Sequence, residues 1–148
     1  MQEFPHRYSI TAVASPDGDV PLQGDRLPTL ATAPPAEFGG PGDRWSPETL
    51  LVAAVADCLI LSFRSIASAS KFNWLSLQCD VEGKLDRVER VTLFTEFRIR
   101  ARLRVPAGTD VEKANRLLEK SEQVCLITRS LKAESHLEAE IEVAVAVG

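Results

Sequence analysis

The chain is poor in the residues on which several common functions depend. It has two histidines, His6 and His136, and neither a CxxC nor an HExxH motif, which argues against a zinc site. Its longest apolar run, Leu50–Ala56, stops at Asp57, far short of the roughly 20 residues that span a bilayer. A formal net charge of -4 gives no general attraction for nucleic acid or anionic lipid. We therefore expect no nucleic-acid partner, no membrane partner, no metal and no other cofactor.

The first residues, MQEFPHRYSI, lack the basic start and apolar core of an export signal. The expected location is therefore cytoplasmic, where the three cysteines, Cys58, Cys79 and Cys125, are reduced at rest. A length of 148 residues suits one domain, residues 1–148, which can bury a core without disulfide bonds.

Hydrophobic periodicity predicts an N-terminal strand over residues 7–14 and a turn at Asp17-Gly18. A connection rich in proline and glycine follows over residues 24–43, and long connections of this kind are often functional. A helix then begins after the N-cap Ser46 and runs to about residue 70. Because it is apolar on nearly every side, we expect it to be buried on most faces.

The second half of the chain predicts two strands, a helix and a final strand. The strands cover residues 75–82 and 91–105, with a turn near Gly83, and the last strand covers residues 137–147. Thr109 and Glu112 form a capping box for the helix, which ends near Cys125. This order predicts an α+β fold, with an antiparallel sheet packed on a long buried helix.

Four arginines alternate along the strand at residues 91–105, and three glutamates alternate along the last strand. A phosphate-binding stripe is one interpretation of the arginines. The other is that the two strands are neighbours, so that the charges pair across the sheet. We favour the second, because the composition gives no net basic surface. The residues are Arg98, Arg100, Arg102 and Arg104, facing Glu138, Glu140 and Glu142.

Each cysteine has two interpretations. Cys79 shares a strand face with apolar residues and is best read as a small buried hydrophobe. Cys58 and Cys125 also lie on apolar helical faces, and free cysteine is among the most buried residue types. Composition and periodicity leave open whether these two are core residues or a reactive pair.

Two motifs resemble the OsmC/Ohr family of osmotically inducible and organic hydroperoxide resistance proteins. The first is the segment FGGPGDRWSPE, which ends at Glu48, followed by an alanine-rich helix with Cys58 ten residues after that glutamate. The second is the segment VCLI around Cys125, followed by Ser130-Leu131. The order of the predicted elements fits this family along essentially the whole chain.

The resemblance implies an OsmC-like fold and an intertwined homodimer. It also implies an antioxidant function, that of a thiol peroxidase which acts under oxidative stress. It assigns Cys58 as the thiol that attacks an organic hydroperoxide and becomes a sulfenic acid. It assigns Cys125 as the thiol that then forms a disulfide with Cys58, which a lipoyl-type dithiol reduces. Glu48 is the family's acidic residue for holding a catalytic arginine. No motif places that arginine here, and we list Arg44 as a candidate, with Arg26 as the other.

Helix geometry adds a constraint on Glu48. Ten helical residues separate it from Cys58 by about 15 Å along the axis and by about 280° around it. The two side chains therefore cannot meet within one straight helix. They meet if two copies of the helix pack antiparallel about a two-fold axis near Ala53, where small residues permit a close approach. We thus expect a homodimer in which Glu48 of the partner subunit faces Cys58.

Two further functions compete with a peroxidase. The chain can instead be a non-enzymatic, redox-responsive or ligand-binding OsmC-like dimer, which the lack of a motif-placed arginine favours. Hydrolysis through Cys58 ranks below both, because no histidine base accompanies the cysteine in a recognisable pattern.

Overall fold

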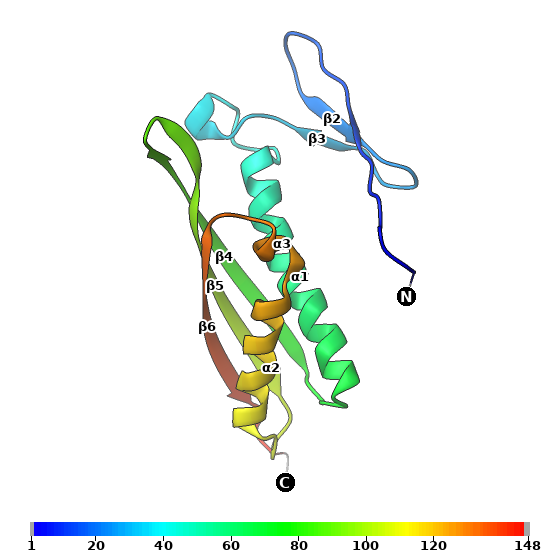
Figure 1. Cartoon of the computed structure of the whole chain (residues 1–148), viewed down its shortest axis with the longest axis vertical. Coiled ribbons are helices and arrows are strands. Elements are labelled where there is room, and N and C mark those ends of the chain that lie inside the picture. The colour runs from blue at the N-terminus through cyan, green and yellow to red at the C-terminus, as the bar shows by residue number, and fades with distance from the viewer. Residues whose placement is uncertain (1, 147–148) are drawn as a thin grey trace. The chain divides into compact units, whose positions relative to one another are not determined.

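A computed structural model describes residues 2–146, in which ten helices and strands are assigned. Figure 1 shows how they are arranged within each unit. The chain divides between Leu51 and Val52 into two compact units. The prediction of a single domain stays a prediction. In chain order the elements are β1 (Thr11–Ala12), β2 (Val20–Gln23), β3 (Leu30–Thr32), the 3-10 helix η1 (Ala36–Phe38), α1 (Pro47–Ala69), β4 (Ser76–Val88), β5 (Val91–Val105), α2 (Val111–Val124), α3 (Leu126–Arg129) and β6 (Glu134–Val143).

The first unit contains a small antiparallel sheet in the order β1-β2-β3. The predicted hairpin around Asp17-Gly18 is present, and Gly18 has a φ of 93°. The paired part of the first strand is shorter than predicted, because Thr11–Ala12 alone pair with β2. The unit ends at Leu51, within the first turns of α1. The predicted N-cap of this helix is confirmed, because Ser46 Oγ accepts from the backbone N–H of Thr49 at 3.1 Å.

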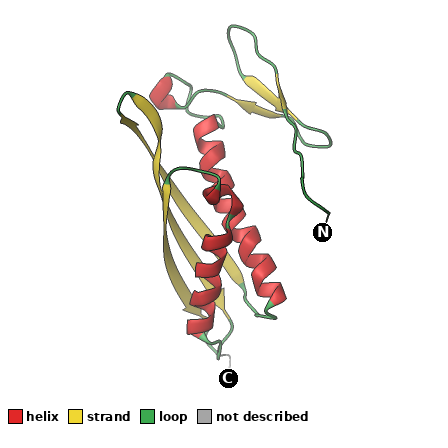
Figure 2. Ribbon diagram, viewed as in Figure 1, coloured by secondary structure: helices red, strands yellow, loops and turns green. Residues whose placement is uncertain are grey.

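The second unit is a three-stranded sheet in the order β4-β5-β6, with helices on one face (Figure 2). The core lies between them, where alternate residues of β5 meet the inward faces of α1 and α2. Its members from β5 are Phe97, Ile99, Ala101, Leu103 and Val105; those from α1 are Val55, Leu59, Phe63 and Ala67; those from α2 are Ala114, Leu117 and Leu118.

The pairing of the last two strands corrects the expected antiparallel sheet. β4 and β5 are antiparallel, but β6 pairs with β5 in parallel. The reason is that α2 and α3 form a crossover connection, which returns the chain to the end of the sheet where β5 began. A period of two along a strand is the same for both pairings, so the periodicity alone cannot separate them.

The predicted pairing of arginines with glutamates on the outer sheet face is confirmed. Arg100 lies opposite Glu138 in the register, with the charged atoms 3.4 Å apart, and Arg102 lies opposite Glu140 at the same distance. These side chains are exposed, so each pair contributes a few tenths of a kcal/mol. The glutamates of β6 therefore compensate Arg100 and Arg102 across the sheet, as the second interpretation predicts.

One predicted turn and one predicted helix cap differ from the structure. Gly83 lies inside β4, not in a turn, and the β4–β5 hairpin turns at Glu89 and Arg90, whose φ values are 49° and 70°. A Cβ on Gly83 would lie 2.9–3.0 Å from side-chain atoms of Phe94, Val52 and Phe97, so the glycine makes room for these side chains. The α2 cap is Asp110, which accepts from the backbone N–H of Lys113. Thr109 instead donates its hydroxyl to the Pro106 carbonyl.

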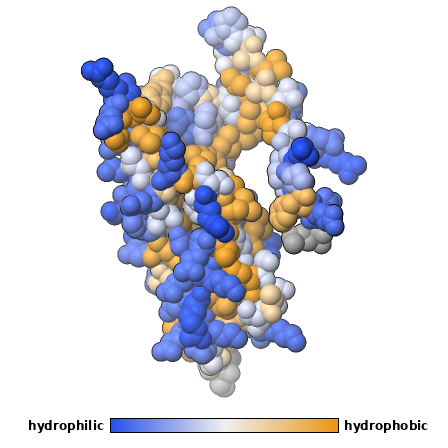
Figure 3. Space-filling model, in the orientation of Figure 1, coloured by the Kyte–Doolittle hydropathy of each residue, from blue (hydrophilic) through white to orange (hydrophobic). Residues whose placement is uncertain are grey.

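Helix α1 is less covered than its composition predicts. Its fully buried positions form a single row, Val55, Leu59, Phe63 and Ala67, spaced by four residues. By length and composition α1 could cross a membrane, and only 22% of its most apolar window is buried within the chain. The absence of a membrane partner stays a prediction. Apolar surface also gathers along the helical face of the second unit (Figure 3). One chain thus leaves much of α1 unpartnered.

Candidate functional site

A groove in the second unit, of about 540 Å³, runs between α1 and the junction of α2 with α3. Its walls are mainly apolar, and the outer side chains are well exposed, with Leu61 at 49% and Leu126 at 66%. Cys58 lies in the wall that α1 provides. The lining residues are Ala54, Asp57, Cys58, Leu61, Ser62, Ser65, Ile66, Val124, Leu126 and Ile127.

The Cys58 thiol is half-buried and has a lowered pKa. Burial by itself raises this pKa, but the opposing contributions are together larger. They come from the backbone N–H of Ile127, the Cys125 side chain, the Ser62 hydroxyl and the backbone N–H of Leu126. The Ser62 oxygen lies 3.9 Å from the sulfur. These donors favour the thiolate, which is the nucleophilic form of cysteine.

Cys125 has the opposite character. It connects α2 to α3 and is 1% exposed. Burial is the largest effect and raises the pKa of its thiol; hydrogen bonds from Thr128 oppose this, and the neighbouring Cys58 adds to it, so that the pKa is raised. The structure thus places the two cysteines that the resemblance paired in one site. One is the accessible, more acidic thiol, and the other is a buried, protonated thiol beside it.

Cys79 matches its predicted place on the inward face of β4. It is half-buried, and burial, Asp80 and Cys125 together raise its pKa to about 11. A thiol with that pKa is almost fully protonated near neutral pH. This is the chemistry of a small core residue, and Cys79 does not line the groove.

Glu48 lies in the first turn of α1, in the first unit. Its Oε1 atom is buried and has no hydrogen-bond partner within residues 2–146. Burying an unpaired carboxylate oxygen is costly, so such an atom usually has a donor in the functional state. The predicted separation of Glu48 from Cys58 along α1 holds, because both lie in one continuous helix.

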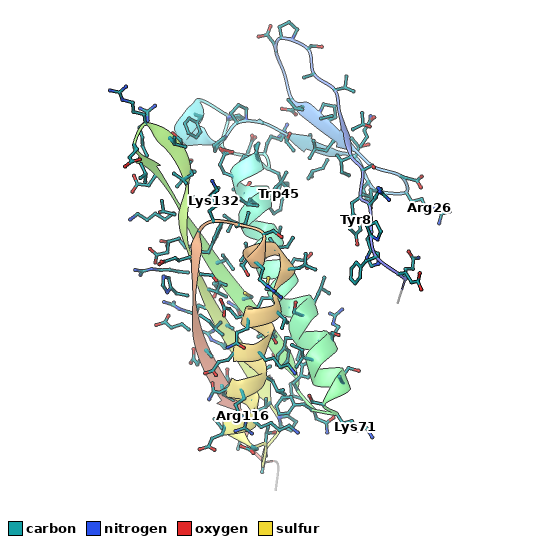
Figure 4. The ribbon with its side chains drawn as sticks, viewed as in Figure 1. Tyr8, Arg26, Trp45, Lys71, Arg116 and Lys132 are labelled. Carbon is teal, nitrogen blue, oxygen red and sulfur yellow. The ribbon has the colours of Figure 1, made fainter. Side chains whose placement is uncertain are left out.

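The two candidate arginines differ in their surroundings. Arg44 contacts Asp19 at 3.0 Å and Asp43 at 3.4 Å, and the hydrogen bond to Asp19 leads the causes that raise its pKa. Its charge is thus already engaged within the first unit. Arg26 is exposed at the turn between β2 and β3, with a φ of 60°, and within residues 2–146 it forms no ion pair (Figure 4).

Sequence reasoning missed the groups that lower the pKa of Cys58. The backbone N–H groups of Leu126 and Ile127 carry no sequence signal, because every residue except proline has one. The break between α2 and α3 was the available hint, since a new helix start presents free N–H groups. Among the described residues no cluster of three or more histidine, cysteine or acidic side chains is placed to hold a metal ion.

The sequence profile of the OsmC-like protein family matches residues 40–140. The chain belongs to the OsmC-like family. This match spans both cysteines of the site and Glu48, and the α+β fold expected from the resemblance is confirmed by the solved structures of relatives.

Similar proteins are known in several bacteria. An uncharacterized Bacillus subtilis protein, YmaD, is 29% identical over an alignment of 119 residues that covers 77% of each chain. An OsmC-like protein of unknown function from Vibrio cholerae has a TM-score of 0.83 at 17% identity, over 91% of this chain and 99% of that one. An organic hydroperoxide resistance protein from Legionella pneumophila has a TM-score of 0.71 at 23% identity, over 97% and 100%. At these identities the structures establish a shared fold.

Proposed function

We propose that this protein is a thiol peroxidase that reduces organic hydroperoxides through Cys58 and Cys125. The observation that carries the proposal is the contrast between the two thiols: an accessible Cys58 with a lowered pKa beside a buried Cys125 with a raised one. Peroxide reduction needs a thiolate to attack and a second thiol to resolve the product. The family membership, with relatives named as organic hydroperoxide resistance proteins, supports the same chemistry.

The first step is attack of the Cys58 thiolate on the terminal oxygen of the hydroperoxide. The O–O bond breaks, the sulfur is oxidised to a sulfenic acid, and the organic part leaves as an alcohol after taking up one proton. The apolar groove suits the organic part of such a substrate, and the N–H groups that stabilise the thiolate belong to its wall.

The second step is resolution by Cys125. Its thiol displaces the hydroxyl of the sulfenic acid, forming a Cys58–Cys125 disulfide and releasing water. An external dithiol of the lipoyl type then exchanges with this disulfide, becoming a cyclic disulfide and returning both cysteines to thiols. Cys125 lies close enough to Cys58 for its side chain to affect the pKa of that thiol.

The working unit in this proposal is a homodimer. The uncovered apolar face of α1 and the unpartnered Oε1 atom of Glu48 both call for a second chain. An antiparallel crossing near Ala53 brings Glu48 of the partner subunit toward Cys58. We expect an arginine to join them there. Arg26 is the better candidate than Arg44, because Arg44 is already bound by two carboxylates.

The decisive experiment measures consumption of cumene hydroperoxide with dihydrolipoamide as reductant. We expect turnover by the wild type, none by Cys58→Ser, and slowed recycling with trapped sulfenic acid in Cys125→Ser. Cys79→Ser is the matched control and should retain turnover. A wild type that is inactive with every dithiol tested would contradict the proposal. It would favour instead the redox-responsive or ligand-binding dimer. No basic side chain of residues 2–146 lines the groove, and this observation supports that alternative.

The dimer has a test of its own in analytical ultracentrifugation. The wild type should sediment at twice the 16.2 kDa chain mass. Ala53→Glu should dissociate it, whereas Ala107→Glu, at an exposed turn, should not. Arg26→Ala should lower peroxide turnover more than Arg44→Ala does, with the exposed Arg116→Ala on α2 as the control. A monomeric, fully active wild type would refute the shared site.

A further inference from the structure

The groove beside Cys58 carries an uneven charge. Among its ten lining residues Asp57 carries a negative charge, and no lysine, arginine or histidine of residues 2–146 lines it. Asp57 is exposed and takes part in no hydrogen bond or ion pair with the side chains that the structure describes. Its charge is therefore not paired within residues 2–146.

Helix geometry keeps Asp57 close to the reacting sulfur. Asp57 and Cys58 are consecutive in α1, with Cα atoms about 3.8 Å apart and side chains turned by about 100° from each other. Asp57 begins the row that continues with Leu61 and Ser65, and all three line the groove. The row of Cys58, Ser62 and Ile66 lies directly beside it. A molecule that is bound in the groove against Cys58 therefore also lies beside the Asp57 row.

We propose that Asp57 is a specificity-determining residue, which makes the groove select neutral organic hydroperoxides over those that carry a carboxylate. This inference rests on the proposed peroxidase function and names its substrate class. Like charges repel more strongly beside apolar walls than in bulk water. A guanidinium paired with Glu48 of the partner subunit adds no net charge, so it does not cancel the effect of Asp57.

The test compares two substrates that differ in charge and by one methyl group, so the change of their ratio between variants isolates the effect of the Asp57 charge. One is cumene hydroperoxide with a carboxylate in the para position, and the other is the methyl ester of that compound. The readout is the ratio of kcat/KM for the acid to kcat/KM for the ester. For the wild type we expect a ratio of about 0.1, because the carboxylate of the acid is repelled by Asp57. It should rise toward one at high salt, because the repulsion is screened.

Asp57→Asn should raise the ratio several-fold at low salt, because it removes the repelling charge. Asp80→Asn is the matched control: it removes the same charge from the outer face of β4 and should keep the wild-type ratio. Equal use of acid and ester by the wild type would overturn the inference, as would a ratio that Asp57→Asn leaves unchanged. Both results leave the peroxidase standing, whereas failure to consume the ester at all would remove the peroxidase and this inference together.

Discussion

The contrast among the three thiols makes a quantitative prediction for alkylation of the reduced protein by iodoacetamide. At pH 8 a thiol with a pKa of about 11, as for Cys79, is ionised in about one molecule in a thousand, and an ordinary thiol in roughly one in ten to one in four. Since the pKa of Cys58 lies below the ordinary value, ionisation favours Cys58 over Cys79 by at least about a hundredfold.

Intrinsic nucleophilicity opposes this advantage. A thiolate of higher pKa reacts faster once formed, with a Brønsted slope of about 0.4–0.5. Over about two pKa units this slope makes the Cys79 thiolate roughly tenfold more reactive than the Cys58 thiolate. The net expectation is that Cys58 reacts at least about tenfold faster than Cys79 at pH 8. The burial of Cys125 and its raised pKa place it behind Cys58 as well.

Mass spectrometry after trypsin digestion measures the three rates separately, because the cysteines fall in different peptides, residues 45–64, 72–84 and 121–129. The Cys58 rate should rise with pH and level off below the pH at which free cysteine does, since a lowered pKa completes ionisation earlier. Cys125→Ala should move that plateau to higher pH, because it removes one of the groups that stabilise the thiolate. Faster labelling of Cys79 or Cys125 than of Cys58 at pH 8 would refute the assignment of the nucleophile.

Three predictions concern stability and are checked by urea unfolding. Phe63→Ala should lower the free energy of unfolding by about 3–5 kcal/mol, because this ring is fully buried and packs edge-on against Trp74, with the ring centroids 5.3 Å apart. Leu75→Ala, at an exposed position, is its control. An equal loss of stability in both variants would contradict the assignment of Phe63 to the core. Gly83→Val should cost about 1–3 kcal/mol by overpacking against Phe94, Phe97 and Val52, whereas a neutral effect would show that these side chains move aside freely. Glu140→Gln should cost less than about 1 kcal/mol, because its partner Arg102 is also exposed; a larger loss would mean that the outer sheet face is covered.

Local signals in the sequence predicted those parts of the fold that depend on neighbouring residues. Ser46 and Pro47 set the start of α1, and the alternation that ends at Pro106 gave the bounds of β5, Val91–Val105, as the structure has them. The β4–β5 turn was misplaced for a physical reason. Glu89 and Arg90 adopt positive φ without being glycine, while the real glycine, Gly83, serves packing instead.

Contacts between residues that are distant in the sequence could not be predicted from hydrophobic periodicity. The parallel direction of β6 follows from the crossover through α2, and its alternation would look the same in either direction. The meeting of Cys58 with Cys125 joins segments far apart in the chain, and apolar surroundings alone described both cysteines as core residues. The family resemblance supplied the pairing, whereas the difference in acidity required the three-dimensional neighbours.

The difference in acidity follows from the break between α2 and α3. In one continuous helix the N–H groups of Leu126 and Ile127 would bond to carbonyls four residues earlier and be unavailable to any other acceptor. Because α2 ends at Val124 and α3 begins at Leu126, these groups are free to approach the Cys58 sulfur. The same break places Cys125 at the junction, buried, with the Thr128 hydroxyl donating to its carbonyl at 3.1 Å. A single interruption of the helix therefore presents the N–H groups that lower the pKa of Cys58, while burial and the neighbouring Cys58 raise the pKa of Cys125.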